Sequence, residues 1–338
     1  MTMQAIVCEQ PGTLSLVARP RPERLAGEVL LRIRRVGMCG TDYHIFRGTQ
    51  PYLAYPRVMG HELAGEVIEG DEGGRFAAGQ IVCVMPYLSC GTCIACRRGK
   101  TNCCVNIQVL GVHRDGGLAE YLAVDARFVI DAAGLTLDQA AMVEFLAIGR
   151  HAVERAALDP GRRVLVAGAG PIGMAVTLFA AQRGAEVTVL DGNRARARFC
   201  VERLGASAII TLDEDVPARV AALTEDDGFS AVFDATGSPT AIEAGFAHVA
   251  HGGTYVLVSI VAADIRFSDP EFHKREMTLM GSRNATIADF EAVIAAIRAG
   301  AVPVGAMHTH SAPLARLPDM IEGWMRPEAR VIKAIVEV

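Results

Sequence analysis

The chain has 338 residues, of which 51% are hydrophobic and 21% are charged, so it can bury sizeable cores and is not intrinsically disordered. Its length suggests two domains, and its net charge of −5, with both signs interspersed, excludes the basic footprint of a nucleic-acid-binding protein. The N-terminus lacks a basic segment followed by an apolar core. We therefore expect no secretory signal, no membrane association and a cytoplasmic location.

The opening of the chain is predicted to be β-rich. Apolar and polar residues alternate from Met3 to about Arg35 around turn signals such as Gln10-Pro-Gly12. The segment 29–36 is typical of a strand. We expect strands in this part of the chain rather than a helical bundle.

A candidate catalytic site follows directly. Cys39, Thr41 and His44 place a thiol, a hydroxyl and an imidazole within six residues, and His61-Glu62 comes shortly after. Cysteine, histidine and glutamate are the ligand types of catalytic zinc. Taken singly, Cys39 is more typical of a small buried residue and His61-Glu62 of a surface pair. The cysteine motif that comes next favours a metal.

Five of the nine cysteines lie between positions 90 and 104. Four thiolates at such short intervals can close a tetrahedron around Zn²⁺ with no open position, which is typical of a structural site. The predicted ligands are Cys90, Cys93, Cys96 and Cys104. We prefer Cys104 to Cys103 because successive side chains point in different directions. An iron–sulfur cluster and disulfides are the weaker alternatives.

Two further segments carry candidate site residues. The loop from Gly111 to Gly117 presents His113 and Arg114, which belong either to a substrate pocket or to a solvated turn. From Leu137 to about Ala157 apolar residues recur at helical spacing, and Glu144 lies inside this run. A carboxylate is costly to bury alone, so Glu144 is a candidate metal ligand or the partner of one.

The stretch 163–191 predicts a nucleotide-binding unit. A β-branched strand is followed by Gly168, Gly170 and Gly173, then by a helix, and then by a second strand that ends in Asp191. The glycines permit a tight turn, close approach of a pyrophosphate, and packing of the helix on the sheet. The uncharged run 164–182 approaches the length of a membrane span, but it contains this motif, so we interpret it as a buried strand and helix.

The acid at the end of the second strand favours NAD. Asp191 follows the last glycine by 18 residues, where a carboxylate suits the ribose hydroxyls of NAD and repels the extra phosphate of NADP. Arg194 and Arg196 argue the other way, because an arginine can accept that phosphate, and we weigh the acid more heavily. The predicted cofactor-binding residues are Gly168, Gly170, Pro171, Ile172, Gly173, Asp191, Arg196, Thr236 and Arg283.

Strands and helices continue to alternate up to about residue 280, which predicts a doubly wound parallel sheet of about six strands. After Gly281-Ser-Arg283-Asn284 the pattern changes to a helix over 288–299 and then to a short strand-rich tail. The tail is too small to form a sheet of its own. We expect it to return to the N-terminal domain.

The motifs in this order resemble those of the zinc-dependent medium-chain dehydrogenase/reductases of the sorbitol dehydrogenase type. The resemblance rests on Cys39-Gly-Thr-Asp42, Gly60-His-Glu62, the four-cysteine lobe, Glu144 and the turn that begins at Gly168. It implies an α/β protein with a Rossmann doubly wound sheet and a β-rich GroES-like catalytic domain. The implied boundaries are 1–148 for the catalytic domain, with a structural zinc lobe at about 88–106, 149–284 for the NAD-binding domain, and 285–338 for a segment that completes the catalytic domain.

The resemblance also assigns roles to the candidate residues. Cys39 and His61 match two ligands of the catalytic zinc, and the third is either Glu62 or Glu144. Thr41 matches a hydroxyl that relays the alcohol proton, and His44 matches the outer end of that relay. The chain departs from the family at Phe145, where relatives have proline, which affects how far the preceding glutamate can reach.

Within the family the closest likeness is to bacterial L-galactonate and L-gulonate 5-dehydrogenases, carried by the stretches 55–61, 109–117, 267–274 and 281–286. It implies NAD-dependent oxidation of a sugar acid at C5 with two zinc ions per chain, in a homodimer or homotetramer. The alternative is a neutral polyol dehydrogenase acting on sorbitol or galactitol. Arg283 is the first choice to hold the substrate carboxylate, and it could equally contact a cofactor phosphate; His113, Arg114 and Lys274 are weaker choices.

Overall fold

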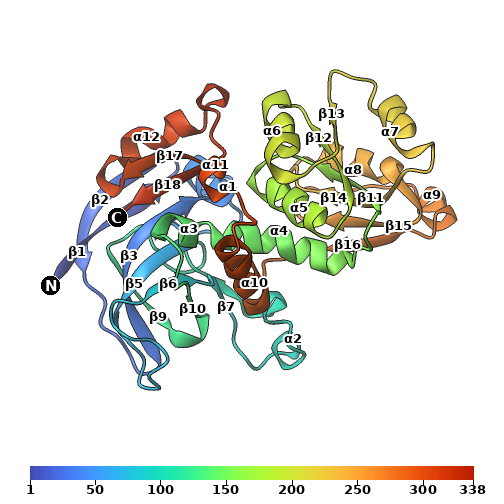
Figure 1. Ribbon diagram of the computed structural model, residues 1–338. Helices are drawn as coiled ribbons and strands as arrows, with labels where there is room; N and C mark the ends of the chain where they lie inside the picture. The colour runs from blue at the N-terminus through green and yellow to red at the C-terminus, as the bar shows by residue number, and fades with distance from the viewer. The chain divides into compact units, whose positions relative to one another are not determined.

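A computed structural model describes all 338 residues and divides them into two compact units. The first unit comprises Met1–Phe145 together with Thr286–Val338, and the second comprises Leu146–Ala285. Both chain termini belong to the first unit, where Figure 1 marks them.

The main sheet of the first unit has seven strands. Their order is β10 (Val129–Asp131), β6 (Ile81–Val84), β5 (Glu62–Glu69), β3 (Glu28–Met38), β18 (Lys333–Glu337) and β17 (His308–Pro313), with β9 (Tyr121–Asp125) paired to β3. Two small sheets accompany it: β2 (Thr13–Pro20), β1 (Thr2–Gln10) and β4 (Arg57–Val58) form one, and β7 (Tyr87–Leu88) and β8 (Gln108–Val109) form the other.

Helices in this unit are few and short. They are α1 (Gly40–Arg47), α2 (Ile94–Arg97), α3 (Leu137–Ala141), α10 (Ile287–Arg298), α11 (Val304–Met307) and α12 (Leu317–Trp324). Single 3₁₀ turns lie at Thr101–Cys103, Ala126–Phe128, Leu314–Arg316 and Pro327–Ala329.

The pairing of β3 brings distant parts of the sequence together. It is antiparallel to β5, with Gly37 opposite Glu62, and antiparallel to β18, with Met38 opposite Ala334. Figure 1 shows β18, in red, beside β3, in blue. The end of β3 and the starts of β5 and β18 therefore lie side by side, and this corner carries the candidate metal ligands.

The single helix expected over 137–157 is in fact two helices, which corrects that prediction. The first, α3, ends at Ala141 with Met142 as its C-terminal cap, and α4 runs over Val143–Ala156. The N–H of Met142 bonds the carbonyl of Gln139, three residues back, which tightens the last turn and breaks the regular spacing. The break puts Glu144 in the first turn of the new helix.

The second unit contains a six-stranded sheet in which every strand pair is parallel. The order is β13 (Ala208–Thr211), β12 (Glu186–Asp191), β11 (Arg163–Ala167), β14 (Phe229–Asp234), β15 (Val249–Leu257) and β16 (Thr278–Gly281). This strand order confirms the predicted doubly wound sheet. The helices are α5 (Pro171–Gln182), α6 (Arg194–Leu204), α7 (Val216–Thr224), α8 (Pro239–Gly245) and α9 (Asp269–Lys274), with a 3₁₀ turn at Phe246–His248.

The central strands β11 and β14 are almost entirely buried, as their continuous apolar runs predict, whereas the edge strand β16 is largely exposed. Helices α5 and α6 pack against each other and against the strands beneath them (Figure 1). One core cluster includes Leu165, Phe229, Val232, Phe246 and Tyr255. The ring of Phe246 meets that of Tyr255 edge-on, with 4.9 Å between the centroids, a favoured aromatic geometry.

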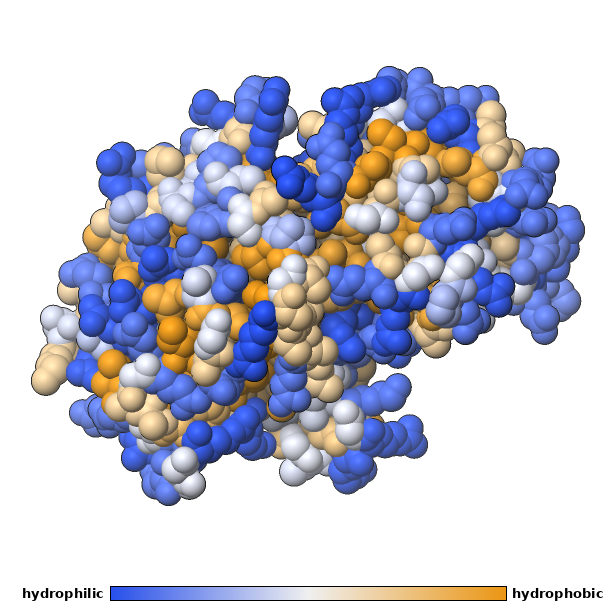
Figure 2. Space-filling view, in the orientation of Figure 1, coloured by the Kyte–Doolittle hydropathy of each residue, from blue (hydrophilic) through white to orange (hydrophobic).

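The visible face in Figure 2 shows hydrophilic residues interspersed with hydrophobic ones. Each helix in the structure is too short or too polar to cross a lipid bilayer. The uncharged run 164–182 forms strand β11, the glycine turn and helix α5.

Candidate active site

Cys39, His61 and Glu62 come together at the corner formed by β3 and β5. Cys39 caps the start of α1 directly after β3, and His61 and Glu62 stand where β5 begins. Their ligand atoms all lie within 4.8 Å of one another. His61 is 5% exposed and Glu62 is fully buried, so the group is sheltered from solvent. A thiol, an imidazole and a carboxylate at these distances form a donor set suited to Zn²⁺.

Asp42 braces this group, although no role was predicted for it from the sequence. Its carboxylate accepts the N–H of Cys39 at 2.9 Å and the N–H of Gly60 at 3.1 Å, and it lies 3.7 Å from Nδ1 of His61. The side chain is fully buried at the third position of α1, where an acid also completes a capping box. The capping pattern was the signal that could have identified Asp42.

Glu144 approaches the group from α4 and has a partner of its own. Its Oε1 accepts a hydrogen bond from the hydroxyl of Tyr87, whereas its Oε2 is buried and has no partner. Burial raises the pKa of Glu144 to about 7, and the charge of Glu62 adds to this although His61 opposes it. Glu144 is not a member of the closely spaced set of three. No local sequence pattern pointed to Tyr87.

Lys333 is the most unexpected residue here. Its ammonium donates to both carboxylate oxygens of Glu62 at 2.6 Å and to the carbonyl of Met38 at 3.1 Å. Lys333 and Glu62 are 1% and 0% exposed, which makes this a fully buried ion pair. The sequence signal for this pair was a single lysine within the apolar C-terminal strand, because a buried charge needs a partner.

The corner has the properties expected of a site for a divalent cation. Nδ1 of His61 and Oε2 of Glu144 are both buried without a hydrogen-bond partner. Burial lowers the pKa of His61, but the charges of Asp42 and Cys39 outweigh it and hold that pKa well above its usual range. The surroundings thus favour a positive charge at this point, and a bound metal would supply it in place of the proton.

Thr41 and His44 both lie on α1, three residues apart, and so on one face of that helix. Thr41 is half-buried and His44 is exposed. Nδ1 of His44 lies 2.8 Å from the hydroxyl of Thr49. Of the two residues, Thr41 is therefore the less exposed and the nearer in sequence to the ligand Cys39.

The four cysteines at Cys90, Cys93, Cys96 and Cys104 form a second group whose sulfur atoms lie within 4.8 Å of one another. Three of the sulfur–sulfur distances are 3.5, 3.5 and 3.9 Å. Thiolates bound to Zn²⁺ at 2.3 Å in a tetrahedron would be about 3.8 Å apart, whereas a disulfide is about 2 Å long. The neighbouring Cys103 is exposed and lies outside this group.

The environment of the lobe favours the thiolate form of Cys90 but opposes that of Cys96. The backbone N–H and hydroxyl of Thr92, with the N–H of Cys93, lower the pKa of Cys90 to about 5. The pKa of Cys96 is instead raised to about 11, first by burial and then by its bond with Cys93. Four neighbouring sulfurs cannot all ionise without a cation among them, and a bound Zn²⁺ would remove that conflict.

The glycine turn of the second unit has the shape that a dinucleotide requires. Gly168 has φ +96°, and a Cβ there would lie 2.8 Å from the carbonyl carbon of Ala235. A Cβ at Gly173 would collide with the carbonyl of Gly168, so the helix packs tightly on the turn. Gly170, at the N-terminus of α5, has nothing within 4 Å of where its Cβ would be. That open space at a helix N-terminus suits a pyrophosphate.

Asp191 lies against this turn. Its carboxylate accepts the N–H of Ala169 at 2.5 Å and that of Asn193 at 2.6 Å, which fixes it beside the glycines. Arg194 is engaged elsewhere, with its guanidinium 3.1 Å from the carboxylate of Asp213. Arg196 lies on the first turn of α6.

Thr236 follows β14 at the same edge of the sheet. Its hydroxyl donates to the buried carboxylate of Asp234 at 2.6 Å, and the hydroxyl of Ser259 donates to the other oxygen. Asp234 thereby joins the loops that follow β14 and β15. Arg283 is exposed after β16, and Lys274 lies 3.8 Å from the carboxylate of Glu271.

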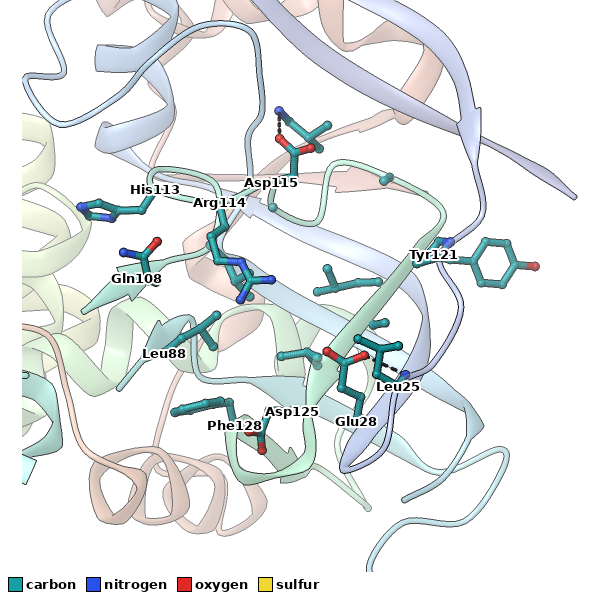
Figure 3. A pocket seen from close by; sticks show the side chains of 18 of the residues that line it. Leu25, Glu28, Leu88, Gln108, His113, Arg114, Asp115, Tyr121, Asp125 and Phe128 are labelled. Carbon is teal, nitrogen blue, oxygen red and sulfur yellow. Dashed lines mark hydrogen bonds between the residues drawn. The ribbon is translucent and has the colours of Figure 1, made fainter. Parts of the chain in front are cut away.

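His113 and Arg114 do not belong to the metal-ligand corner. Both line a cavity of about 980 Å³ in the first unit, whose lining includes none of the three close ligands. Figure 3 shows the two side chains projecting in different directions from their loop. The ring of His113 stacks on that of Tyr52, with 6.4 Å between the centroids. Asp115, at the same loop, pairs with Arg19 at 2.8 Å.

Each of the two units contains a segment that matches a known protein family. Residues 25–134 match the alcohol dehydrogenase GroES-like domain, and residues 171–299 match the zinc-binding dehydrogenase family. The chain is 41% identical over 336 residues to an L-galactonate-5-dehydrogenase of Escherichia coli, a match that covers 99% of each chain.

Two solved structures share the whole fold. An alcohol dehydrogenase from Escherichia coli in complex with NADH has a TM-score of 0.93 and 28% identity, covering 100% of this chain and 99% of that one. A zinc-binding dehydrogenase from Sinorhizobium meliloti bound to NADP has a TM-score of 0.91 and 27% identity, covering 100% of both chains.

Proposed function

This chain belongs to the zinc-binding alcohol dehydrogenase family, and we propose that it oxidises the C5 hydroxyl of a sugar acid such as L-galactonate or L-gulonate, with zinc and NAD. The reaction class rests on one observation, the close approach of Cys39, His61 and Glu62 within 4.8 Å. The substrate class is supported by the 41% identity to an L-galactonate-5-dehydrogenase over nearly the whole of both chains.

Two zinc ions per chain are proposed. Cys39, His61 and either Glu62 or Glu144 would hold the catalytic ion, and three protein ligands leave a fourth position for substrate. The four cysteines of the lobe would hold the other and leave no position open. When bound, the catalytic zinc supplies Lewis acidity at the alcohol oxygen and NAD supplies the hydride acceptor.

The first unit would also move the alcohol proton. The Thr41 hydroxyl can accept that proton and pass its own on, and His44 on the same face of α1 can receive one at its ring. Because His44 is exposed and hydrogen-bonded to Thr49, it can release the proton to water. The buried corner keeps water away from the ligands, which strengthens their interaction with a cation.

NAD is proposed over NADP. Asp191 is held beside the glycine turn by the N–H groups of Ala169 and Asn193, where its charge would repel a 2′-phosphate. Arg194, which could accept such a phosphate, is 3.1 Å from Asp213. The helix N-terminus at Gly170 and the loop at Thr236 would contact the rest of the dinucleotide, with Arg196 and Arg283 at its edges.

A sugar acid also brings a carboxylate, and Arg283 is proposed to bind it. Arg283 is an exposed residue two positions after β16, at the carboxyl edge of the sheet, where ligands of such folds bind. Lys274 is paired with Glu271, and Arg114 lines a separate cavity. The other role for Arg283 is contact with a cofactor phosphate.

The substrate test is NADH formation with L-galactonate, L-gulonate, sorbitol and galactitol, in the wild type and in R283A. We expect faster turnover of the acids, and a rise of about tenfold or more in KM for the acids alone in R283A, as for loss of a charged hydrogen bond. Faster turnover of galactitol or sorbitol would instead establish the polyol alternative. An equal rise in KM for NAD would assign Arg283 to the cofactor.

We also propose that the enzyme is a cytoplasmic homodimer or homotetramer. Strand β16 is the edge of its sheet, and Leu279 on it is 37% exposed, which leaves backbone groups and an apolar side chain available to a second copy. Light scattering after size-exclusion chromatography measures the mass directly.

A further inference from the structure

Asp234 is a fully buried acid at the carboxyl end of β14, and the partners of its side chain are neutral. They are the hydroxyl and N–H of Thr236 and the hydroxyl of Ser259. The N–H groups of Val258 and Ser259 also bond its backbone carbonyl, at 2.9 and 3.2 Å. A buried carboxylate costs free energy unless its oxygens are hydrogen-bonded, so the neighbouring loops must keep these donors in place.

The bonds to Asp234 join two loops. The Thr236 hydroxyl donates to one carboxylate oxygen at 2.6 Å and accepts the N–H of Ser238 at 3.1 Å, which fixes the loop after β14. The Ser259 hydroxyl donates to the other oxygen, which fixes the loop after β15. The two loops therefore share one anchor, the Asp234 carboxylate, at the carboxyl edge of the sheet.

The loop after β14 packs directly against the glycine turn. The N–H of Ala235, the residue after Asp234, bonds the carbonyl of Ala167 at 2.8 Å. A Cβ at Gly168 would lie 2.8 Å from the carbonyl carbon of Ala235, and a Cβ at Gly173 would lie 3.5 Å from the Ala235 side chain. The anchored segment thus forms one wall of the turn that is proposed to hold the pyrophosphate.

The strand order indicates which half of the dinucleotide these loops face. The sheet consists of two halves, β13-β12-β11 and β14-β15-β16, and a dinucleotide lies across the point where the order reverses. Asp191, at the end of β12, is proposed to bind the adenosine ribose, which assigns the first half to the adenosine end. The loops after β14 and β15 therefore belong to the half that is left for the nicotinamide end.

We propose that Asp234 is a positioning residue that holds the loops after β14 and β15 in the form that accepts the nicotinamide half of the cofactor. This inference rests on the proposed function, since it requires NAD at the glycine turn. Asp234 is buried beneath the loops and acts through Thr236 and Ser259.

The test measures the affinity of the zinc-containing enzyme for NADH and for ADP, which lacks the nicotinamide nucleoside, by titration calorimetry. Asp234→Asn and Ser259→Ala each disrupt the anchor. In both variants we expect NADH to bind about tenfold more weakly and ADP to bind as it does to the wild type. Ser259→Thr keeps the hydroxyl and should bind NADH as the wild type does. Asp191→Ala is the reciprocal variant and should weaken both ligands by the same factor.

Thr224→Ala is the matched control for a general loss of stability. The buried Thr224 hydroxyl donates to the carbonyl of Val220 at 2.8 Å and accepts the N–H of Gly228 at 3.0 Å. It lies before β14, at the opposite edge of the sheet from Asp234. This variant should lower the melting temperature and leave both affinities unchanged.

Unchanged NADH affinity in D234N and S259A overturns the inference. Equal weakening of NADH and ADP in these variants also overturns it, because the anchor would then not act on the nicotinamide half. Where D234N does not fold, S259A and S259T decide. A loss of NADH affinity in T224A as large as that in S259A would show that the effect comes from stability alone. A wild type that binds neither NADH nor ADP would contradict the proposed function itself.

Discussion

The carboxylate of Asp42 lies 3.7 Å from Nδ1 of His61, and it accepts a hydrogen bond of 3.1 Å from the N–H of Gly60, the residue before His61. Through its bond to the N–H of Cys39 it also fixes the turn between β3 and α1. One buried acid thus sets the separation of two candidate zinc ligands and orients the imidazole of one of them. Carboxylates in this position typically raise the basicity of a ligating histidine.

Asp42→Asn should therefore weaken zinc binding at the catalytic site by about 10–100-fold while leaving the lobe zinc in place. Titration against a chelator of known affinity measures the change. Asp138→Asn is the matched control, because Asp138 pairs with Arg35 and is 41% exposed. Equal zinc affinity in the Asp42 and Asp138 variants would contradict the bracing role of Asp42.

The lobe offers a control in the adjacent residue. Cys104→Ser removes one of the four clustered sulfurs, whereas Cys103→Ser changes an exposed side chain outside the cluster. We expect metal analysis to find one zinc fewer per chain in C104S and no change in C103S. Because binding energy of a structural zinc is folding energy, the lobe should also become sensitive to proteolysis in C104S alone. Equal zinc content in the two variants would contradict the assignment of Cys104 as a ligand of the lobe zinc.

The metal-free protein should lose stability as the pH rises, because of Glu144. Its pKa is about 7 in the folded protein against an ordinary 4.5, so the folded state holds this proton more tightly than the unfolded chain does. The resulting stabilisation is complete below pH 4.5 and is lost as the pH rises through 7, by about 3 kcal/mol. Urea unfolding followed by the fluorescence of Trp324, the single tryptophan, reports on the first unit.

Glu144→Gln supplies the comparison for that titration, since the amide does not ionise. In the presence of a chelator, the free energy of unfolding of the wild type should fall relative to that of E144Q as the pH rises from 4.5 to 7. With zinc bound, the Glu144 carboxylate is ionised throughout this pH range. The difference in free energy of unfolding between the wild type and E144Q should then no longer change in this way with pH. Parallel pH profiles of the two metal-free proteins would show that Glu144 does not titrate in this range.

Asp191→Ala should lower the preference for NAD over NADP, measured as the ratio of kcat/KM values, by about tenfold or more, since one charge facing the 2′-phosphate is removed. Asp226→Asn changes the net charge equally but lies before β14, at the opposite edge of the sheet, and should leave the ratio unchanged. An unchanged ratio in D191A would place the ribose elsewhere.

The second unit was predictable from sequence because its signals are local. The strand, the three glycines and the acid at Asp191 fall within 29 consecutive residues, 163–191, and the sheet they form has the expected parallel order. The break at Met142 was not predictable, since apolar residues keep their helical spacing across it. A tightened turn changes the backbone without changing that pattern.

The metal corner was predictable only in part. Its ligand types stand in recognisable motifs, but their partners come from far along the chain. Tyr87 is 57 positions from Glu144, and Lys333 is 271 positions from Glu62. The Lys333–Glu62 pair follows from the register of β3 with β5 and β18, which no local pattern specifies. The sequence therefore does not distinguish Glu62 from Glu144 as the third zinc ligand.

The proposed function depends most on an alcohol being oxidised at the metal held by Cys39. The decisive measurement is zinc content together with NADH formation from L-galactonate, in the wild type and in Cys39→Ser. We predict two zinc ions and turnover for the wild type, and one zinc ion with no detectable turnover for the variant. Undiminished NADH formation by the Cys39→Ser enzyme would contradict this assignment of the catalytic centre.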